Sequence, residues 1–213
     1  INNSELDYLI IARSDGAPTY NLTVVVDDLD MNITHIIRGD DHVNNTPRQI
    51  NMIEALGGIL PNYAHLPMIL GNDGKRMSKR HGAVSVTAYE DEGYLPEALL
   101  NYLVRLGWAH GDQEIFSQQE MIALFSLEHV NKSAAAFDID KLQWLNQQYI
   151  KQASNQQLST WVELAFSKNN IKKSSPEQLN KVIELQKDRV KTLSEMANAS
   201  EYFFADFEYY DEK

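Results

Sequence analysis

A strand, a helix and a second strand can be predicted in succession near the start of this 213-residue chain, and they constrain its fold most strongly. Residues 33–39 form an apolar, β-branched run that ends in glycine and predicts a buried strand. Thr46 and Pro47 are typical of a helix N-cap and first turn, and Gly57–Gly58 is typical of a helix end. The apolar run 66–70 predicts the second strand. Because such a crossover joins parallel strands, we expect a parallel sheet.

The segments on either side of this unit have different patterns. Before it, residues 6–13 favour a short extended approach, whereas residues 19–28 fit either a helix or a buried strand. After it, helical patterns dominate, with Asp140 expected to cap one of the helices. Other capping and stop signals predict helices at 94–107, 117–125, 156–168, 176–186 and 193–204. The sequence therefore predicts an α/β region followed by an all-helical region.

A glycine-rich basic segment, residues 71–82, follows the second predicted strand. Glycine allows a backbone to approach a ligand closely, and Lys and Arg pair with phosphate oxygens. The four cations of this segment are Lys75, Arg76, Lys79 and Arg80. In open α/β sheets ligands bind beyond the carboxyl ends of strands, where residues 38–42 are also expected. We predict that the two segments, and Lys79 and Arg38 in particular, share one crevice; the alternative is a solvated basic loop.

Composition excludes several classes of protein. The chain lacks cysteine, and therefore thiolate metal sites and disulfides. It has no apolar run of about 18 residues, and its first residues do not resemble a signal peptide, so no membrane association is expected. The net charge of −11 argues against a protein that coats nucleic acid, although local basic patches remain compatible with RNA binding.

Residues 77–80, Met-Ser-Lys-Arg, resemble the second signature of class I aminoacyl-tRNA synthetases, usually written Lys-Met-Ser-Lys-Ser. The continuation His81-Gly82 is similar to the glutamyl branch of that family. Other segments are also similar to bacterial glutamyl-tRNA synthetases, namely 18–21, 25–28, 34–42, 45–49, 93–103, 106–108 and 144–146. The first signature of the family, His-Ile-Gly-His, is absent from the chain.

The resemblance implies a division of the chain into three parts. Residues 1–85 are expected to form the C-terminal half of a Rossmann-like catalytic domain, including the basic loop. Residues 86–150 are expected to form a helical region that contacts the tRNA stem. Residues 151–213 are expected to begin a helical anticodon-binding domain. The resemblance implies that this chain lacks the first half of the nucleotide-binding fold, so the isolated chain is expected to be inactive.

The resemblance also implies roles for individual residues. Lys79 is the expected catalytic residue, because a cation on a loop can neutralise charge that builds on departing phosphate oxygens. Arg38 and Tyr20 are expected to bind the side chain of glutamate, since a guanidinium pairs with a carboxylate through two hydrogen bonds. The expected ATP-binding residues are Asp41, His42, Met77, Ser78, Lys79 and Arg80.

Each of these roles has a structural alternative. The alternative for Arg38 is an ion pair with a nearby carboxylate, on Asp27, Asp28, Asp40 or Asp41. Tyr20 is alternatively a core residue, and His42 a structural histidine. No metal site is expected in this segment, because its histidines lack the spacing of metal ligands.

As a whole, the resemblance implies the ATP-dependent ligation of L-glutamate to tRNA(Glu) through a glutamyl-adenylate. The implied substrates are ATP with Mg2+, L-glutamate and the tRNA, and the expected enzyme is a cytoplasmic monomer. A tRNA-modifying glutamyl transferase and a non-catalytic RNA-binding module are the alternatives. The helical segment after residue 155 argues against the transferase, and the presence of Arg38 and Lys79 argues against the non-catalytic module.

Overall fold

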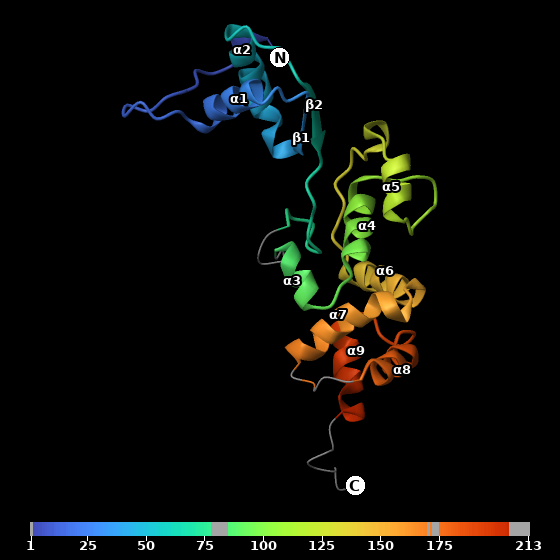
Figure 1. Cartoon of the computed structure of the whole chain (residues 1–213). Helices are drawn as coiled ribbons and strands as arrows, with labels where there is room; N and C mark the ends of the chain where they lie inside the picture. The colour runs from blue at the N-terminus through green and yellow to red at the C-terminus, as the bar shows by residue number, and fades with distance from the viewer. Residues whose placement is uncertain (1, 78–84, 170, 172–174, 205–213) are drawn as a thin grey trace. The chain divides into compact units, whose positions relative to one another are not determined.

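The computed structural model describes residues 2–77, 85–169, 171 and 175–204 of the chain. The chain divides into two compact units. Unit 1 comprises residues 1–68 and 131–134, and unit 2 comprises residues 69–130 and 135–213. The predicted order of an α/β region followed by an all-helical region is confirmed (Figure 1).

Unit 1 contains a parallel pair of strands and two packed helices. Val25 of α1 and Ile53 of α2 are almost completely buried, so the core of this unit lies between these two helices. The elements are η1 (Asn3–Glu5), α1 (Tyr20–Asp30), β1 (His35–Gly39), η2 (Asp40–Asn45), α2 (Thr46–Ala55) and β2 (Asn62–Leu66).

The parallel sheet is confirmed, but the second strand begins earlier than expected. Strand β1 pairs with β2 in a register that sets His35 opposite Asn62 and Arg38 opposite His65. The strand was predicted at residues 66–70, yet it ends at Leu66. The next residue, Pro67, has no backbone N–H to donate to a sheet.

Two further local expectations differ from the structure, which also decides between a helix and a strand for one segment that the sequence left open. Residues 6–13 form no strand in the part of the chain that the structure describes, and only an isolated bridge links Ala12 to Pro18. The ambiguous segment after Thr19 is helix α1. Strand β1 is not fully buried, because Ile37 is 48% exposed. In the described residues of unit 1, β1 and β2 form a two-stranded sheet.

The elements of unit 2, in its described residues, are helices joined by irregular segments. Its elements are α3 (Val86–Asp91), α4 (Pro96–Gly107), α5 (Gln118–Leu124), η4 (Leu127–His129), α6 (Ile139–Gln152), α7 (Asn155–Lys168), α8 (Pro176–Gln186), α9 (Leu193–Ser200) and η5 (Glu201–Phe203). One apolar cluster joins α7, α8 and α9 to the start of α4 and the end of α6. Helix α3 was not predicted.

A buried amide connects three segments of unit 2. The side chain of Asn146 on α6 is fully buried. Its Oδ1 accepts a hydrogen bond from the backbone N–H of Leu95 at 2.8 Å, and its Nδ2 donates to the carbonyl of Lys191 at 2.7 Å. Because buried backbone groups are costly when left unpaired, this one side chain fixes the entry to α4 beside the entry to α9.

The cap of helix α6 is Asp138, not Asp140 as expected from the sequence. Asp138 Oδ1 accepts hydrogen bonds from the backbone N–H groups of Asp140 at 2.9 Å and Lys141 at 3.2 Å. Asp140 is the second residue of the helix that begins at Ile139. Its carboxylate therefore lies in the first turn, where it interacts with the helix dipole.

This difference predicts unequal effects of two alanine substitutions. Asp138→Ala should lower the free energy of unfolding by about 1 kcal/mol, because two N–H groups lose their acceptor. Asp140→Ala should lower it by roughly 0.3–0.5 kcal/mol, the usual contribution of a carboxylate near a helix start. Urea unfolding of the full chain, followed by circular dichroism, measures both values. Equal effects, or a larger effect at Asp140, would contradict the assignment of the cap.

Candidate functional site

Arg38 lies at the carboxyl end of β1, and it contacts three uncharged side chains that come from two other elements, β2 and α2. Its Nε donates to Nε2 of His65, directly opposite on β2, at 3.4 Å. Its Nη2 donates to Oγ1 of Thr46, in the first turn of α2, at 2.9 Å. The ring of Tyr63, two residues before His65 on the same face of the sheet, lies 5.5 Å from the guanidinium carbon. The side chain is thus held on several sides without an ion pair.

The hydroxyl of Thr46 connects these groups. Besides accepting from Arg38, it lies 3.1 Å from His65 Nε2 and 3.3 Å from the backbone carbonyl of His42. The sequence predicted Thr46 as an N-cap, and this is wrong: Thr46 is already helical, and the N-cap residue is Asn45, whose side chain makes no capping hydrogen bond. Its hydroxyl is engaged with Arg38 and His65.

The surroundings of His65 lower its pKa and so favour its neutral form. Burial lowers the pKa of its imidazole, and the positive charge of Arg38 lowers it further, with a smaller contribution from His42. The negative charge of Asp40 opposes these effects. The hydrogen bond from Arg38 has the same consequence, because an Nε2 atom that accepts a hydrogen bond carries no proton.

Tyr20 and His42 lie next to this cluster. Their rings are 5.9 Å apart and tilted by 36°. His42 Nδ1 is 3.2 Å from the amide nitrogen of Asn45, and its Nε2 is 4.0 Å from Oδ1 of Asp41. Tyr20 is 54% exposed, so it is not a core residue in this chain. Unit 1 therefore brings together Tyr20, Arg38, Asp41 and His42, four of the eight predicted site residues.

The carboxylates near Arg38 act at longer range. Burial raises the pKa of Asp28, the nearby charge of Arg38 opposes this rise, and Asp27 adds to it. Within the described ranges, Arg38 forms no ion pair within 4 Å of a carboxylate. The alternative of a structural ion pair therefore does not account for the position of this side chain.

The basic segment belongs to unit 2, and its described part is a closed turn. The backbone N–H of Gly71 donates to the carbonyl of Lys75, and Gly74 has the positive φ of 72° that favours glycine. Leu70 pairs with Arg76 on one side and with Ala136 on the other. The basic segment thus directly follows a residue, Leu70, that is bridged on both sides.

Of the predicted signature, residues 77–80, the structure describes Met77. Its backbone N–H donates to the carbonyl of Ile69. Ser78, Lys79 and Arg80 lie outside the described residues. The expected convergence of Arg38 and Lys79 on one crevice therefore stays a prediction.

Two searches of the described residues concern other kinds of site. They contain no group of three or more His, Asp or Glu side chains that could hold a metal ion. None of the helices in those same residues is both long and apolar enough to cross a membrane.

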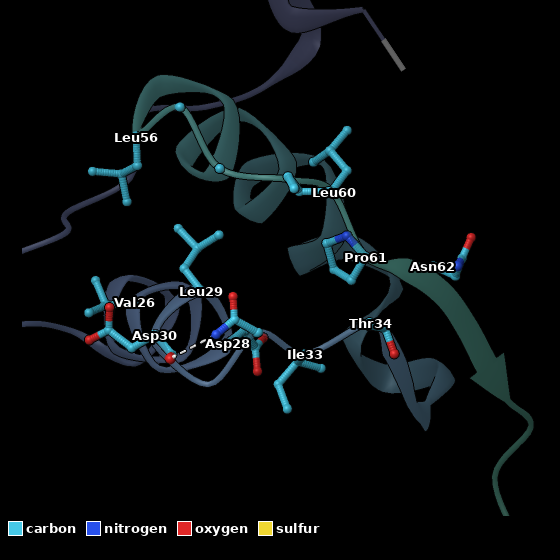
Figure 2. Close-up of a pocket in the computed structure, with 14 residues that line it drawn as sticks. Val26, Asp28, Leu29, Asp30, Ile33, Thr34, Leu56, Leu60, Pro61 and Asn62 are labelled. Atoms are coloured by element: carbon cyan, nitrogen blue, oxygen red, sulfur yellow. Dashed lines mark hydrogen bonds between the residues drawn. The ribbon is translucent and has the colours of Figure 1, made fainter.

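A cavity of about 830 Å³ in unit 1 lies apart from the predicted site residues. It is lined by residues of α1, of the segment between α1 and β1, and of the segment between α2 and β2, together with the first residue of β2 (Figure 2). Val26, Leu29, Ile33, Leu56 and Leu60 give it a largely apolar lining. Its lining residues do not include the predicted site residues Tyr20, Arg38, Asp41 and His42. This cavity is therefore not the predicted site.

Sequence reasoning missed Thr46, Tyr63 and His65 as members of the site. Tyr63 and His65 lie on β2, which was predicted four residues too late. With the strand in its observed position, parallel pairing sets His65 opposite Arg38. The alternation Tyr-Ala-His before Pro67 was the available signal, since residues two apart in a strand share a face.

Comparisons with known proteins show the family to which the chain belongs. Residues 1–144 match the family described as tRNA synthetases class I (E and Q), catalytic domain. Residues 142–213 match the anticodon binding domain. The chain belongs to the class I tRNA synthetase family for E and Q, and the predicted resemblance to bacterial glutamyl-tRNA synthetases is confirmed.

Two kinds of relatives define the extent of the similarity. Proteins named glutamate–tRNA ligase 1 and 2, from strains of Coxiella burnetii, are 62% identical over all 213 residues, which are 45% of their own length. A crystal structure of a glutamate tRNA ligase from Elizabethkingia meningosepticum, in complex with its amino acid, has a TM-score of 0.85 and 35% identity. A glutamate-tRNA synthetase from Elizabethkingia anophelis has a TM-score of 0.84 at the same identity. Both structural matches cover all of this chain and 46% of the solved one.

The contacts of His65 predict an effect of pH. Its pKa in the folded chain lies below the ordinary value of 6.5. Between these two values the unfolded chain binds more protons than the folded chain, so stability should fall as pH falls below about 6.5. We expect an NMR titration of the His65 ring to have its midpoint below 6.5, and Arg38→Gln to raise that midpoint. His65→Gln should lose less stability than the unsubstituted chain from about pH 7 to about pH 5.5. A midpoint at or above 6.5 would contradict this account.

Proposed function

We propose that this chain is the part of a glutamate–tRNA ligase that holds the side chain of glutamate, the ATP phosphates and part of the tRNA. The complete enzyme ligates L-glutamate to tRNA(Glu) through a glutamyl-adenylate, with ATP supplied as its Mg2+ complex. Family membership and relatives that bear this name support the proposal. The single observation that carries it within the chain is the guanidinium of Arg38, held by neutral partners at the end of a parallel strand.

On the glutamate side, Arg38 binds the side-chain carboxylate and Tyr20 forms a wall of the same pocket. The guanidinium keeps its charge available, because Thr46 and His65 do not neutralise it. A carboxylate gains two charge-assisted hydrogen bonds from such a group, whereas the amide of glutamine lacks the charge. The half-exposed ring of Tyr20 is accessible to a small molecule.

On the ATP side, Lys79 is the catalytic residue. The α-carboxylate of glutamate attacks the α-phosphorus, and the bond between the α- and β-phosphates breaks. Negative charge then develops on the departing pyrophosphate. A lysine that reaches those oxygens in the transition state lowers the barrier to their departure. Met77, Ser78 and Arg80 shape and charge the same loop, and Asp41 and His42 bind the adenosine portion.

The remainder of the chain binds tRNA. We retain three parts: residues 1–85 for the catalytic half-domain, 86–150 for the contact with the tRNA stem, and 151–213 for the start of the anticodon-binding domain. The match of residues 142–213 to an anticodon binding domain favours this assignment over a transferase that lacks one. The complete enzyme is proposed to be a cytoplasmic monomer. Since the chain spans under half of its relatives, we expect it to be inactive alone.

A segment exchange tests the proposed function. This chain should replace the corresponding 213 residues of the Coxiella burnetii ligase, to which it is 62% identical. The chimaera should catalyse exchange of pyrophosphate into ATP when both glutamate and tRNA(Glu) are present. A folded chimaera without exchange activity, or exchange that does not depend on tRNA, would count against the proposal. Glutamine in place of glutamate is the specificity control.

Arg38→Lys in the chimaera should raise KM for glutamate by roughly 10- to 100-fold, because a lysine cannot form the paired hydrogen bonds of a guanidinium. KM for ATP should change little. Arg48→Lys is the matched control, since the Nη1 of Arg48 donates to the backbone carbonyl of Asn44. The role of Arg38 is wrong if both substitutions leave KM for glutamate unchanged.

Lys79→Ala should lower kcat for pyrophosphate exchange by roughly 10²–10³-fold, with a smaller effect on KM for glutamate. The reason is that its charge is needed most in the transition state. Lys181→Ala, an exposed position on α8, is the control and should retain kcat. Steady-state kinetics at saturating tRNA measure both variants. Equal values of kcat for them would remove Lys79 from the mechanism.

A further inference from the structure

The guanidinium of Arg38 has two edges that can each pair with a carboxylate. One edge consists of Nε and Nη2, and the other of Nη1 and Nη2. The contacts of Arg38 occupy the first edge: Nε donates to His65 Nε2 at 3.4 Å, and Nη2 donates to Thr46 Oγ1 at 2.9 Å. The two acceptor atoms lie 3.1 Å from each other, within hydrogen-bond distance, so the Thr46 hydroxyl can donate to His65 Nε2 while its oxygen accepts from Arg38.

These two acceptors come from different elements that the fold holds in fixed positions. His65 is opposite Arg38 in the register of the parallel strands. Thr46 lies in the first turn of α2, and its hydroxyl also contacts the backbone carbonyl of His42 at 3.3 Å. All three side chains are partly buried, which makes their hydrogen bonds less exposed to competing water.

Both acceptors are uncharged. The hydroxyl of Thr46 has no charge, and the low pKa of His65 keeps its imidazole neutral near pH 7. The two hydrogen bonds therefore orient the guanidinium without cancelling its positive charge. A carboxylate in the place of either group would orient it equally well, but would also neutralise it.

We propose that Thr46 and His65 are positioning residues, which occupy the Nε/Nη2 edge of Arg38 with neutral acceptors and so reserve its charged Nη1/Nη2 edge for the side-chain carboxylate of the substrate. This inference rests on the proposed function and adds to it the geometry of recognition. Preference for a carboxylate over an amide then depends on the neutrality of both acceptors as well as on Arg38 itself.

The surroundings of Arg38 limit how its charge can be offset. Asp28 interacts electrostatically with Arg38, and Asp40 acts on His65. On the ring side, Tyr63 lies 5.5 Å from the guanidinium carbon and supports it by a cation–π contact. The guanidinium of Arg38 is thus oriented by neutral groups, namely Thr46 and His65 at one edge and Tyr63 at one face.

The test uses the chimaera and compares two substitutions of His65, by glutamine and by glutamate, which have the same shape but differ in charge. His65→Gln retains a neutral side chain that can accept from Nε, whereas His65→Glu places a carboxylate on the same edge. We expect His65→Gln to raise KM for glutamate less than threefold, and His65→Glu to raise it by roughly 10- to 100-fold through loss of the charge-assisted pair. KM for ATP and kcat at saturating glutamate should change little in both variants. The same pair of substitutions at His35, an exposed position on β1, is the control.

A second series addresses the hydroxyl. Thr46→Val preserves shape and removes the acceptor, so KM for glutamate should rise by roughly tenfold, and Thr46→Ser should restore it. Thr23→Val is the control, because the hydroxyl of Thr23 bonds only to the helical carbonyl of Thr19 among the described residues. The melting temperature of every variant shows whether a rise in KM comes from misfolding or from a misplaced Arg38 in a folded protein. If Thr46→Val unfolds, the residue 65 series decides.

The outcomes separate this inference from the proposed function. If Arg38→Lys raises KM for glutamate but His65→Glu and Thr46→Val do not, the positioning roles are overturned and the proposed function stands. If all of these variants, Arg38→Lys included, leave KM unchanged, Arg38 does not bind glutamate, and both ideas fail. If kcat and both KM values change together with the melting temperature, the two residues are merely structural and the inference is overturned.

Discussion

The register of one pair of parallel strands determines the geometry of the candidate site. Because β1 and β2 pair with Arg38 opposite His65, a cation and a hydrogen-bond acceptor meet across the sheet, and Tyr63 lies on the same face. A shift of one residue would direct these side chains to opposite faces. The short 3-10 helix after β1 then returns the chain, so that the first turn of α2 brings Thr46 to the same guanidinium.

The groups that orient the guanidinium of Arg38 do not neutralise its charge. The molecule carries a net charge of −11, yet Arg38 is held by a hydroxyl, an imidazole and an aromatic ring. A cation held in this way retains most of its attraction for an anion, since each neutral hydrogen bond offsets little of its charge. The same logic makes the protonation of His65 unfavourable, which connects the local geometry to the dependence of stability on pH.

Much of the fold was predictable from local signals, while several exact positions were not. The crossover unit, the capping box at Ser117 and helix α8 follow from short sequence patterns. The apolar residues 66–70 predict the second strand four residues too late, because Pro67 cannot donate a hydrogen bond to the sheet and the strand ends before it. The cap of α6 was assigned to Asp140 because two aspartates near one helix start are equivalent by type, and only the backbone conformation distinguishes them.

The sequence by itself determined the family, the order of an α/β region before an all-helical one, and four residues that unit 1 gathers in one place, namely Tyr20, Arg38, Asp41 and His42. These follow from motifs and periodicity, which are properties of neighbouring residues. Tertiary structure alone decided that Thr46 and His65 share one edge of Arg38, and that Asn146 links α6 to the starts of α4 and α9. Such pairings depend on strand register and helix packing, and these arise only when segments distant in sequence exclude water together.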